Sequence, residues 1–486
     1  MIKCELRKNI TEGVVSMYNS ILQLALELTE KICKRAEEGE IKDIDVMASH
    51  VADDCRKTSA EIVQAITKMM NENIRQDKET RKELGLVIKE SDRSRQIFTA
   101  LGMLDIERDY FYDRINRRHV ALLDQLIGLD RYERVGGTVK ADLAKRAADV
   151  SYAKSADIVT RGEISRQTVR NCILEAEVPE IEPREERKAV EELHVYADED
   201  HAHMQKEHKE RGKKSRIVPL VTVTEGTEKI TDRRSRTIEP MHFVDENFDT
   251  KELWKTVEGY IDKAYDVTGI KKICVHGDGG QWIRSGLTDF SQTEHIMDGY
   301  HFFKELKKVS RILPNRNVRQ AIVSSLEKDD HRRADRFIQD LLEEPITGNE
   351  RQTICGFATY LFGNWDEIRR RITEQVPGSC TESQVSHVLS ERFSRDPVGW
   401  SDEGLGKLTT IRVYLKNGGE LTKDMFRKKS VKYERYSEYA DRFIEDNLEG
   451  AIDFSIFEPE KLIFDVASGT QKAIRGLGLL RDISIQ

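Results

Sequence analysis

The stretch that most constrains the fold is a strand-like segment that ends in acidic residues. Residues 193–205 read LHVYADEDHAHMQ, in which apolar residues alternate with polar or aromatic ones. A period of two predicts a β-strand with one face toward a core and the other toward a site. Asp198 and Asp200 fall on the second face, where a buried carboxylate is costly unless something pairs with it. The segment is therefore either an ordinary strand with an acidic turn or a strand that delivers a carboxylate to a site.

Two further strand-like runs also end at an aspartate. Residues 273–280 (ICVHGDGG) stop at Asp278 among glycines that permit a tight turn, and residues 295–301 (HIMDGYH) stop at Asp298. Parallel strands of an α/β sheet present their carboxyl ends to one shared crevice. Carboxylates that gather there repel one another unless a hard cation lies among them. The sequence therefore predicts a Mg²⁺ site of the kind that supports phosphoryl transfer.

Length and composition indicate a soluble, helix-rich chain of several domains. The chain has 486 residues, of which 38% are hydrophobic and 34% charged, and domains commonly take roughly 150 residues each. No run of about 18 apolar residues predicts a membrane span, and the N-terminus has no apolar signal core. The seven cysteines form no C-x-x-C pair, so neither a zinc knuckle nor a disulfide framework is predicted. We expect a cytoplasmic protein.

The charge distribution leaves nucleic-acid binding open. A net charge of −8 and a pI near 6.0 argue mildly against it, but local patches matter more than the total. Basic patches occur at residues 209–216, 304–319, 369–371 and 427–435. Each one alone is typical of a solvated surface, and four beside a predicted metal site favour DNA contact.

The first 135 residues predict two small units. Residues 1–95 carry apolar side chains at helical spacing, including the segment 59–87, and predict either a dimer-forming helical arm or a plain bundle. Residues 96–135 predict a small β-hairpin and helix unit, with strands at 97–104 and 106–112 and a break at Gly102.

Residues 136–176 predict a helix-turn-helix unit. A first helix at 139–150 precedes a second that Ser151 can cap and a third, 166–174, that Ser165 can cap. The third helix turns four hydrogen-bonding side chains outward: Arg166, Gln167, Arg170 and Asn171. Such side chains let a recognition helix reach base edges in the major groove. The alternative is a three-helix unit with a structural role only.

The remaining residues predict an α/β core that helices interrupt. After a linker at 177–192, residues 193–301 read strand, strand, strand, helix, strand, helix, strand, with strands at 217–224 and 241–244. This is the order of an RNase H-like fold. Residues 302–378 predict an all-helical insertion, and residues 379–402 predict the core helix that carries Glu382. Residues 403–486 predict a structural cap or a DNA-contacting tail.

Glu382 is the predicted third acidic residue. The segment 379–389 (SCTESQVSHVL) predicts a helix that Ser379 or Thr381 can cap, with Glu382 in its first turn. The N-terminal end of a helix stabilises a carboxylate. A glutamate in the first turn of a helix commonly only interacts with the helix dipole. As the third member of an Asp, Asp, Glu set, however, Glu382 is also a candidate site residue.

Short motifs throughout the chain resemble one known family. They are LGML at 101–104, YFYD at 110–113, SRQTV at 165–169, ADEDH at 197–201, GDGGQWI at 277–283, DGYH at 298–301, NW at 364–365, ESQVSH at 382–387, PVGWS at 397–401 and NGG at 417–419. The chain thereby resembles the ISLre-two type insertion-sequence transposases, which are related to Mutator-like DDE enzymes. The spacing D-x-x-H from Asp298 to His301 is similar to a motif of the Mutator-like enzymes.

The resemblance implies a multidomain α protein with an α/β core: an RNase H-like catalytic domain with an all-helical insertion, preceded by a helical arm and a helix-turn-helix. It implies DDE chemistry, in which Asp198, Asp278 and Glu382 hold two Mg²⁺ or Mn²⁺ ions. The 104 positions between Asp278 and Glu382 fit the insertion. The expected partners are double-stranded DNA, as terminal inverted repeats and target, and further copies of the chain in a dimer or larger homo-oligomer. The expected location is the prokaryotic cytoplasm, at the nucleoid and not at a membrane.

Several alternatives remain open at this level. Asp200 shares a face with Asp198, and Glu391 rivals Glu382 because residues 380–382 read CTE where family members carry Cys-Ser-Ala-Glu. His301 either positions a phosphate or supports the fold around Asp298. The other functions that fit are a catalytically silent DNA-binding regulator on an RNase H-like scaffold and a plain metal-dependent nuclease.

Overall fold

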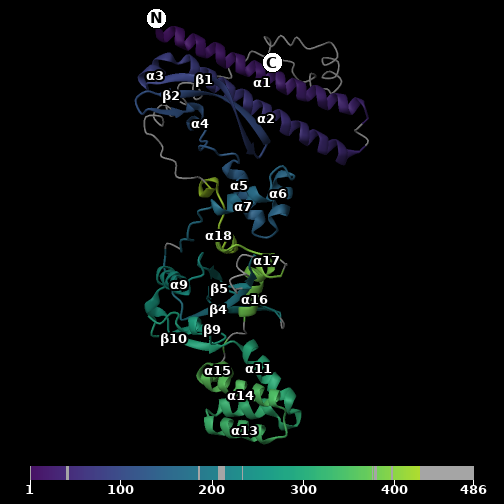
Figure 1. Cartoon of the computed structure of the whole chain (residues 1–486), viewed down its shortest axis with the longest axis vertical. Coiled ribbons are helices and arrows are strands. Elements are labelled where there is room, and N and C mark those ends of the chain that lie inside the picture. Colours follow the sequence, from purple (N-terminus) through teal and green to yellow (C-terminus); the bar gives the residue numbers. More distant parts are fainter. Residues whose placement is uncertain are drawn as a thin grey trace, which may run out of the picture. The chain divides into compact units, whose positions relative to one another are not determined.

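The computed structural model describes residues 2–39, 43–183, 186–205, 214–231, 234–374, 376, 380–395 and 398–426. The chain divides into two units, residues 1–140 with 427–486 and residues 141–426 (Figure 1). Four sequence predictions lie outside the described residues, wholly or in large part: the C-terminal region beyond 426, the basic patches at 209–216 and 427–435, and a cap from Ser379.

The first unit begins with two long helices that lie side by side. They are α1 (Ile2–Glu37) and α2 (Ile44–Gln76), and Arg35 Nε donates to Asp54 Oδ2 over 2.8 Å between them. The prediction that helical structure reaches residue 87 was wrong. A short helix α3 (Lys78–Glu83) follows α2, and Gly85 then turns the chain with a φ of 70°. A positive φ is easy for glycine and ends the helical path, so a strand begins directly afterwards.

The predicted hairpin is confirmed, but its strands are longer than expected and its turn lies at residues 100–101, inside the first predicted strand, 97–104. Its strands are β1 (Leu86–Thr99) and β2 (Gly102–Asp113), which pair antiparallel, and β3 (Arg118–Val120) adds a third strand. Helix α4 (Leu122–Leu126) and α2 cover the sheet over a shared apolar core. The first half of β1 was missed because residues 89–94, KESDRS, are exposed and have no apolar alternation.

The three helices predicted between residues 137 and 174 are confirmed. They are α5 (Gly137–Ala147), α6 (Tyr152–Thr160) and α7 (Arg166–Leu174). The Ser151 hydroxyl accepts from the amide of Lys154, and the Ser165 hydroxyl accepts from the amide of Thr168. Each serine thus satisfies an amide that has no partner inside its helix.

A buried arginine joins these helices to the C-terminal part of the second unit. Arg412 lies on α18 (Asp402–Lys416) and donates to the carbonyl oxygens of Ala148 and His387 over 2.7 and 2.9 Å. It also contacts Asp149 and the carboxylate of Glu391. The end of α5 and the helical segment after residue 380 therefore share one cation.

A five-stranded mixed sheet forms the centre of the second unit. Its strands, in spatial order, are β10 (Thr293–Met297), β9 (Lys272–Gly277), β4 (Glu192–His203), β5 (Ser215–Thr224) and β8 (Met241–Phe243). Strands β9 and β10 run parallel to β4, and β5 is antiparallel to both β4 and β8. All five strands were predicted. The ribbon of β6 (Thr227–Thr231) and β7 (Arg234–Thr237) was not.

Both faces of the sheet are covered (Figure 1). Helix α9 (Thr250–Ala264) packs on the face that carries Val195 and Ala197. On the other face His194 and Tyr196 are also buried, at 4% and 1% exposure, because α16 (Thr381–Val385) lies against β4. The expectation that this face opens into a site was therefore wrong for these two residues, and the strand becomes accessible only from Asp198 onward.

Helices follow the last strand, as the sequence predicted for residues 302–376. They are α11 (Gly299–Ile312), α12 (Val318–Glu327), α13 (His331–Glu343), α14 (Gly348–Gly363) and α15 (Trp365–Thr373). These helices share an apolar core of their own. The chain returns to the sheet through α16, a π-helical turn at Ser386–Ser390 and α17 (Glu391–Phe393).

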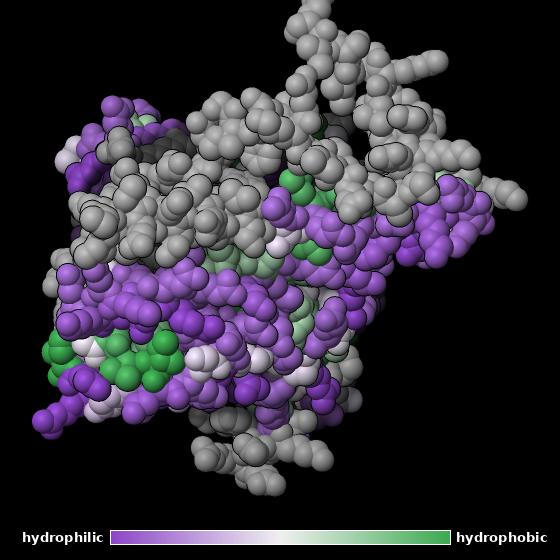
Figure 2. Space-filling model, turned by 90° about the horizontal axis from the view of Figure 1, so that it is seen from above, coloured by the Kyte–Doolittle hydropathy of each residue, from purple (hydrophilic) through white to green (hydrophobic). Residues whose placement is uncertain are grey.

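The surface is mainly polar on the face shown in Figure 2, with small apolar patches. Among the described residues, no helix combines the length and apolar character that a bilayer crossing requires.

Candidate metal centre at the ends of the central strands

Asp198 lies where β4 leaves the core. It pairs with Leu220 of β5, and its Oδ1 accepts a hydrogen bond from the amide of Glu199 over 2.8 Å. The pKa of the Asp198 carboxyl is raised to about 7, mainly by burial and with smaller contributions from the carboxylates of Asp278 and Glu382, whereas the Glu199 amide and His301 act to lower it. Burial and like charge both favour the neutral acid. Asp198 therefore occupies a partly buried place beside two other carboxylates.

Asp278 follows β9 on an exposed turn beside Asp198. Its Oδ1 accepts from the amide of Gly280 over 2.9 Å. Gly279 has a φ of 86°, and a Cβ there would lie 2.3 Å from Oδ1 of Asn364. The glycines around Asp278 are thus required by backbone conformation and by space. The sequence predicted the tight turn but not the neighbour that crowds it.

The neighbour belongs to the NW motif at the start of α15. Arg284 donates to Oδ1 of Asn364 over 2.6 Å, and Nε1 of Trp365 donates to Asp329 over 2.8 Å. These contacts hold Asn364 against the Gly279 turn. In the sequence, this motif served only as part of the family resemblance. Its structural role could not be predicted because it depends on a contact between residues 80 positions apart.

Glu382 and His301 complete the group around Asp198. One ligand atom from each of Asp198, His301 and Glu382 lies within 4.8 Å of the others, and Nε2 of His301 is 3.6 Å from Oε1 of Glu382. That ring nitrogen is buried and has no hydrogen-bond partner within the described part of the chain. His301 therefore lies beside two of the predicted acidic residues, and both roles expected for it stay predictions.

The helix that carries Glu382 differs in detail from the prediction. The residue before its first turn is Cys380, no side chain caps it, and Thr381 is already helical. Glu391 lies on α17 and is held away from the group by His387 and Arg412, over 2.9 and 3.6 Å. Its contact with His387 lowers the pKa of Glu391. The structure thus brings Glu382 to Asp198 and directs Glu391 elsewhere.

Asp200 and Asp298 occupy different positions from Asp198. Asp200 is buried farther along β4, and its Oδ2 has no hydrogen-bond partner among the residues that the structure describes. Asp298 is buried at the start of α11, where its Oδ1 accepts from the amide of Tyr300 over 2.7 Å. Asp298 therefore caps the helix whose first turn carries His301.

The donor set fits a hard divalent cation. Mg²⁺ prefers oxygen ligands, and Asp198, Asp278 and Glu382 supply carboxylate oxygens at one edge of the sheet. A cation there would also offset the repulsion that Asp278 and Glu382 exert on the Asp198 carboxylate. Mn²⁺ accepts the same oxygens and also tolerates an imidazole such as that of His301.

The predicted recognition helix presents three of its four polar side chains to solvent. Arg166, Gln167 and Asn171 are exposed, and Nε2 of Gln167 donates to Oδ1 of Asn171 over 3.1 Å. The outward position expected for Arg170 was partly wrong. It is half-buried, with its guanidinium 3.7 Å from the carboxylate of Glu403 on α18, because α18 packs against α7.

Fold and site together define a mixed α/β protein with a carboxylate-rich centre at the ends of its central strands. The chain belongs to the uncharacterised protein family UPF0236, whose family model matches residues 37–430. Two UPF0236 proteins of Caldanaerobacter subterraneus subsp. tengcongensis are each 30% identical to it over 418 residues. These 418 residues cover 85% of this chain and 83% and 79% of the relatives.

The family is present in many copies in that genome. One of its UPF0236 proteins is encoded at eleven loci, and that protein is also 30% identical to this chain over 418 residues. Such multiplicity is typical of insertion-sequence elements. Among solved structures, the Drosophila P element transposase strand transfer complex matches with 10% identity over 64% of this chain and 93% of that one. Its TM-score of 0.23 is too low to support an argument.

Proposed function

We propose that the chain is the DDE transposase of an insertion sequence, which cleaves DNA at terminal inverted repeats and transfers the strand to a target. The observation that carries the proposal is the group of Asp198, His301 and Glu382 at the ends of the central strands, with Asp278 close enough to raise the pKa of Asp198. A spread of family motifs along the chain and the many genomic copies of its relatives support the same conclusion.

The strand order supports an RNase H-like core. The sheet runs β10-β9-β4-β5-β8, with the first three strands parallel to one another and the last two alternating. This is the arrangement of RNase H-like sheets, in which acidic residues come from the central strand, its parallel neighbour and a later helix. Asp198, Asp278 and Glu382 correspond to those positions. Helices α11–α15 then form the all-helical insertion.

The side chains have separable roles in this proposal. Asp198, Asp278 and Glu382 would hold two Mg²⁺ or Mn²⁺ ions, which when bound supply activation of the attacking water or 3′-hydroxyl and stabilisation of the leaving oxygen. His301 lies beside Glu382 and would orient a phosphate oxygen of the bound strand. Asp298 positions His301 through the helix cap. Arg166, Gln167 and Asn171 would read the terminal repeats, and DNA and further copies of the chain are the partners.

The test uses DNA that flanks the coding sequence in its genome. The full chain is incubated with duplexes that carry the terminal repeats, with Mg²⁺ or Mn²⁺, and both cleaved and joined products are measured. A transposase cuts at the repeat boundary and joins the freed 3′ end to a second duplex. Asp278→Asn should abolish both products while repeat binding stays within about twofold, because an amide keeps the shape but not the charge.

Two other outcomes would overturn the proposal in distinct ways. Cleavage of any duplex without joining would identify a plain metal-dependent nuclease. Tight binding to the repeats without cleavage by the unaltered chain would identify a silent DNA-binding regulator on the same scaffold.

A further inference from the structure

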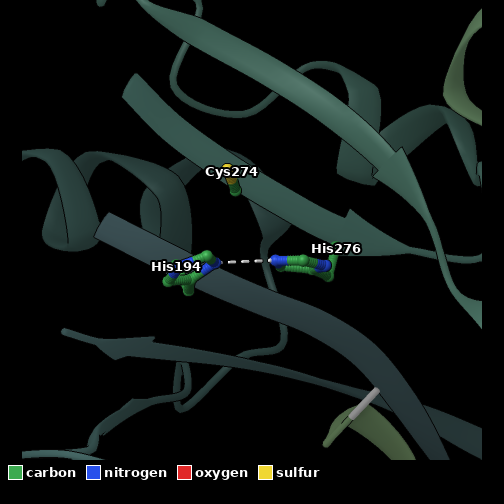
Figure 3. A group of neighbouring side chains, drawn as sticks. All are labelled: His194, Cys274 and His276. Carbon is green, nitrogen blue, oxygen red and sulfur yellow. Dashed lines mark hydrogen bonds between the residues drawn. The ribbon is translucent and has the colours of Figure 1, made fainter. Parts of the chain in front are cut away.

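A second cluster of metal-ligating side chains lies inside the sheet, away from the three carboxylates. His194 comes from β4, and Cys274 and His276 come from β9 (Figure 3). His194 and Cys274 are register partners on these parallel strands, and residues two apart on a strand face the same side. Strand pairing therefore brings all three side chains to one face of the sheet. Sequence reasoning missed them because no C-x-x-C or H-x-x-H spacing marks the group.

The cluster has nearly the dimensions of a zinc site. Nδ1 of His194 and Nε2 of His276 face each other at 3.1 Å, and the ligand atoms of all three residues lie within 4.8 Å of one another. Zinc–nitrogen bonds of about 2.0–2.1 Å in a tetrahedron put two nitrogens about 3.3 Å apart. Small side-chain movements would thus place the nitrogens and the sulfur around one ion.

We propose that His194, Cys274 and His276 bind a Zn²⁺ ion within the sheet. Imidazole and thiolate donors suit zinc, whereas Mg²⁺ takes oxygen ligands. All three side chains are buried, at 4%, 0% and 1% exposure. The site is chemically and spatially distinct from the carboxylate centre, and it does not depend on the proposed DNA chemistry.

The surroundings favour this ion. Oε1 of Glu192 lies 3.6 Å from Nε2 of His194, the ring nitrogen turned away from His276. A histidine on zinc commonly donates its other N–H to a carboxylate, which fixes its tautomer, and Glu192 stands in that place. The ring of Tyr196 stacks on His276 with centroids 4.6 Å apart and holds its orientation.

The charged and titratable groups around the cluster are also compatible with a bound Zn²⁺ ion. Sγ of Cys274 donates to Oε1 of Glu192 over 3.1 Å, and burial raises the pKa of that thiol, so zinc would have to displace its proton. Burial lowers the pKa of both histidines and leaves them neutral, as ligands must be. The nearby ammonium of Lys272 is paired with Glu374 and Glu294 over 2.5 and 2.9 Å.

A bound ion would connect the two strands that carry the candidate catalytic aspartates. On β4, His194 lies four residues before Asp198. On β9, His276 lies two residues before Asp278, which follows the end of the strand. A ligand bridge at this point fixes the register of β4 against β9. Zinc would therefore act as a structural tie beneath the carboxylate centre.

The first test measures bound zinc in the purified full chain by elemental mass spectrometry. We expect about one zinc per chain, a loss of at least about tenfold in Cys274→Ser and His276→Gln, and no change in the control Cys355→Ser, whose thiol is exposed on α14. Absence of zinc from the unaltered chain, even after addition of zinc and dialysis, would overturn the proposal. Retention of zinc by both cluster variants would do the same.

The second test identifies the ligands and does not require a folded variant. Cobalt is exchanged for zinc in the unaltered chain, and the absorption spectrum is recorded. A thiolate-to-cobalt charge-transfer band in the near ultraviolet, with strong ligand-field bands in the visible, is expected. A cobalt spectrum without the thiolate band would exclude Cys274 as a ligand and overturn the site. Asp278→Asn should keep both zinc and the cobalt spectrum, so failure of DNA cleavage and failure of the zinc site are distinguishable.

Discussion

At the scale of single residues, the proton on Asp198 links the carboxylate centre to pH. Its pKa of about 7 lies well above the ordinary value of 3.8. Between those two values the folded chain holds a proton that the unfolded chain has lost. Stability of the metal-free protein therefore falls as pH rises from about 4 to about 7. A cation that needs the carboxylate competes with this proton and gains affinity over the same range.

The first prediction concerns that competition. Affinity for Mg²⁺ or Mn²⁺, measured by calorimetry, should rise about tenfold per pH unit below about pH 7 and level off above it, because one proton leaves when the ion binds. The acid limb of the cleavage rate should move to lower pH as the metal concentration increases. Asp198→Asn should remove the pH dependence of any residual binding. A flat affinity profile from pH 5.5 to 8 would show that Asp198 is not a ligand.

The second prediction separates the carboxylates by matched pairs. Loss of a group that only orients a ligand costs about 10–100-fold, so Asp198→Asn and Glu382→Gln should each lower the cleavage rate by more than about 100-fold. Their neighbours Asp200→Asn and Glu391→Gln should keep most of the activity, because neither belongs to the group around His301. Activity in Glu382→Gln together with its loss in Glu391→Gln would reassign the third acidic residue.

At the scale of single elements, the sequence predicted features that depend on neighbouring residues, such as helix caps. It did not predict which elements are buried by segments far away in the chain. Ser151 and Ser165 marked two helix starts because a cap involves only the next few residues. The five strands followed from apolar runs bounded by glycine or acidic residues. The buried surroundings of His194 and Tyr196 could not be read, because the helix that covers them comes nearly 200 residues later. The contact of Arg170 with Glu403 was not predicted either, because these two residues are also far apart in the sequence.

The third prediction belongs to α7. Gln167→Ala should cost roughly 1–3 kcal/mol of binding to the terminal repeats and little on a scrambled duplex, because an exposed amide can pair with a base edge. Arg170→Ala should weaken repeat binding less, since α18 already engages that side chain. Fluorescence anisotropy on both duplexes measures the difference. Equal losses on both duplexes for Gln167→Ala would mean that this residue contacts only the phosphate backbone.

The fourth prediction concerns the turn that presents Asp278. Gly279→Ala should destabilise the chain by about 1–3 kcal/mol, because alanine is strained at positive φ and its Cβ meets Asn364. Gly356→Ala is the matched control. It lies inside α14 with open space around it, and alanine there should stabilise by about 0.5–1 kcal/mol. Denaturant unfolding of both variants gives the comparison, and an unchanged midpoint for Gly279→Ala would contradict the assigned crowding.

At the scale of the whole second unit, Arg412 joins parts that are distant in sequence. It contacts the end of α5, the π-helical turn after α16 and the carboxylate of Glu391. Removal of one partner of a buried ionic contact costs about 3–5 kcal/mol. Arg412→Met should therefore lower the unfolding free energy by that amount, whereas Arg332→Met, at an exposed position on α13, should change it by less than about 0.5 kcal/mol. Equal stabilities would show that the contacts of Arg412 are replaceable.

If the chain cuts DNA as proposed, the contacts of Arg412 would set a fixed distance between the bases that it recognises and the bond that it cuts. Arg412 donates to the carbonyl oxygen of Ala148, next to the end of α5, and to that of His387 in the turn that follows α16. The helix that carries Arg412, α18, also packs against α7. If α7 binds a fixed set of bases, the strand enters the carboxylate centre at a fixed number of nucleotides from them. The cut would then follow the protein's dimensions: one base pair inserted between the recognised bases and the element's end should move the cleaved bond by one nucleotide.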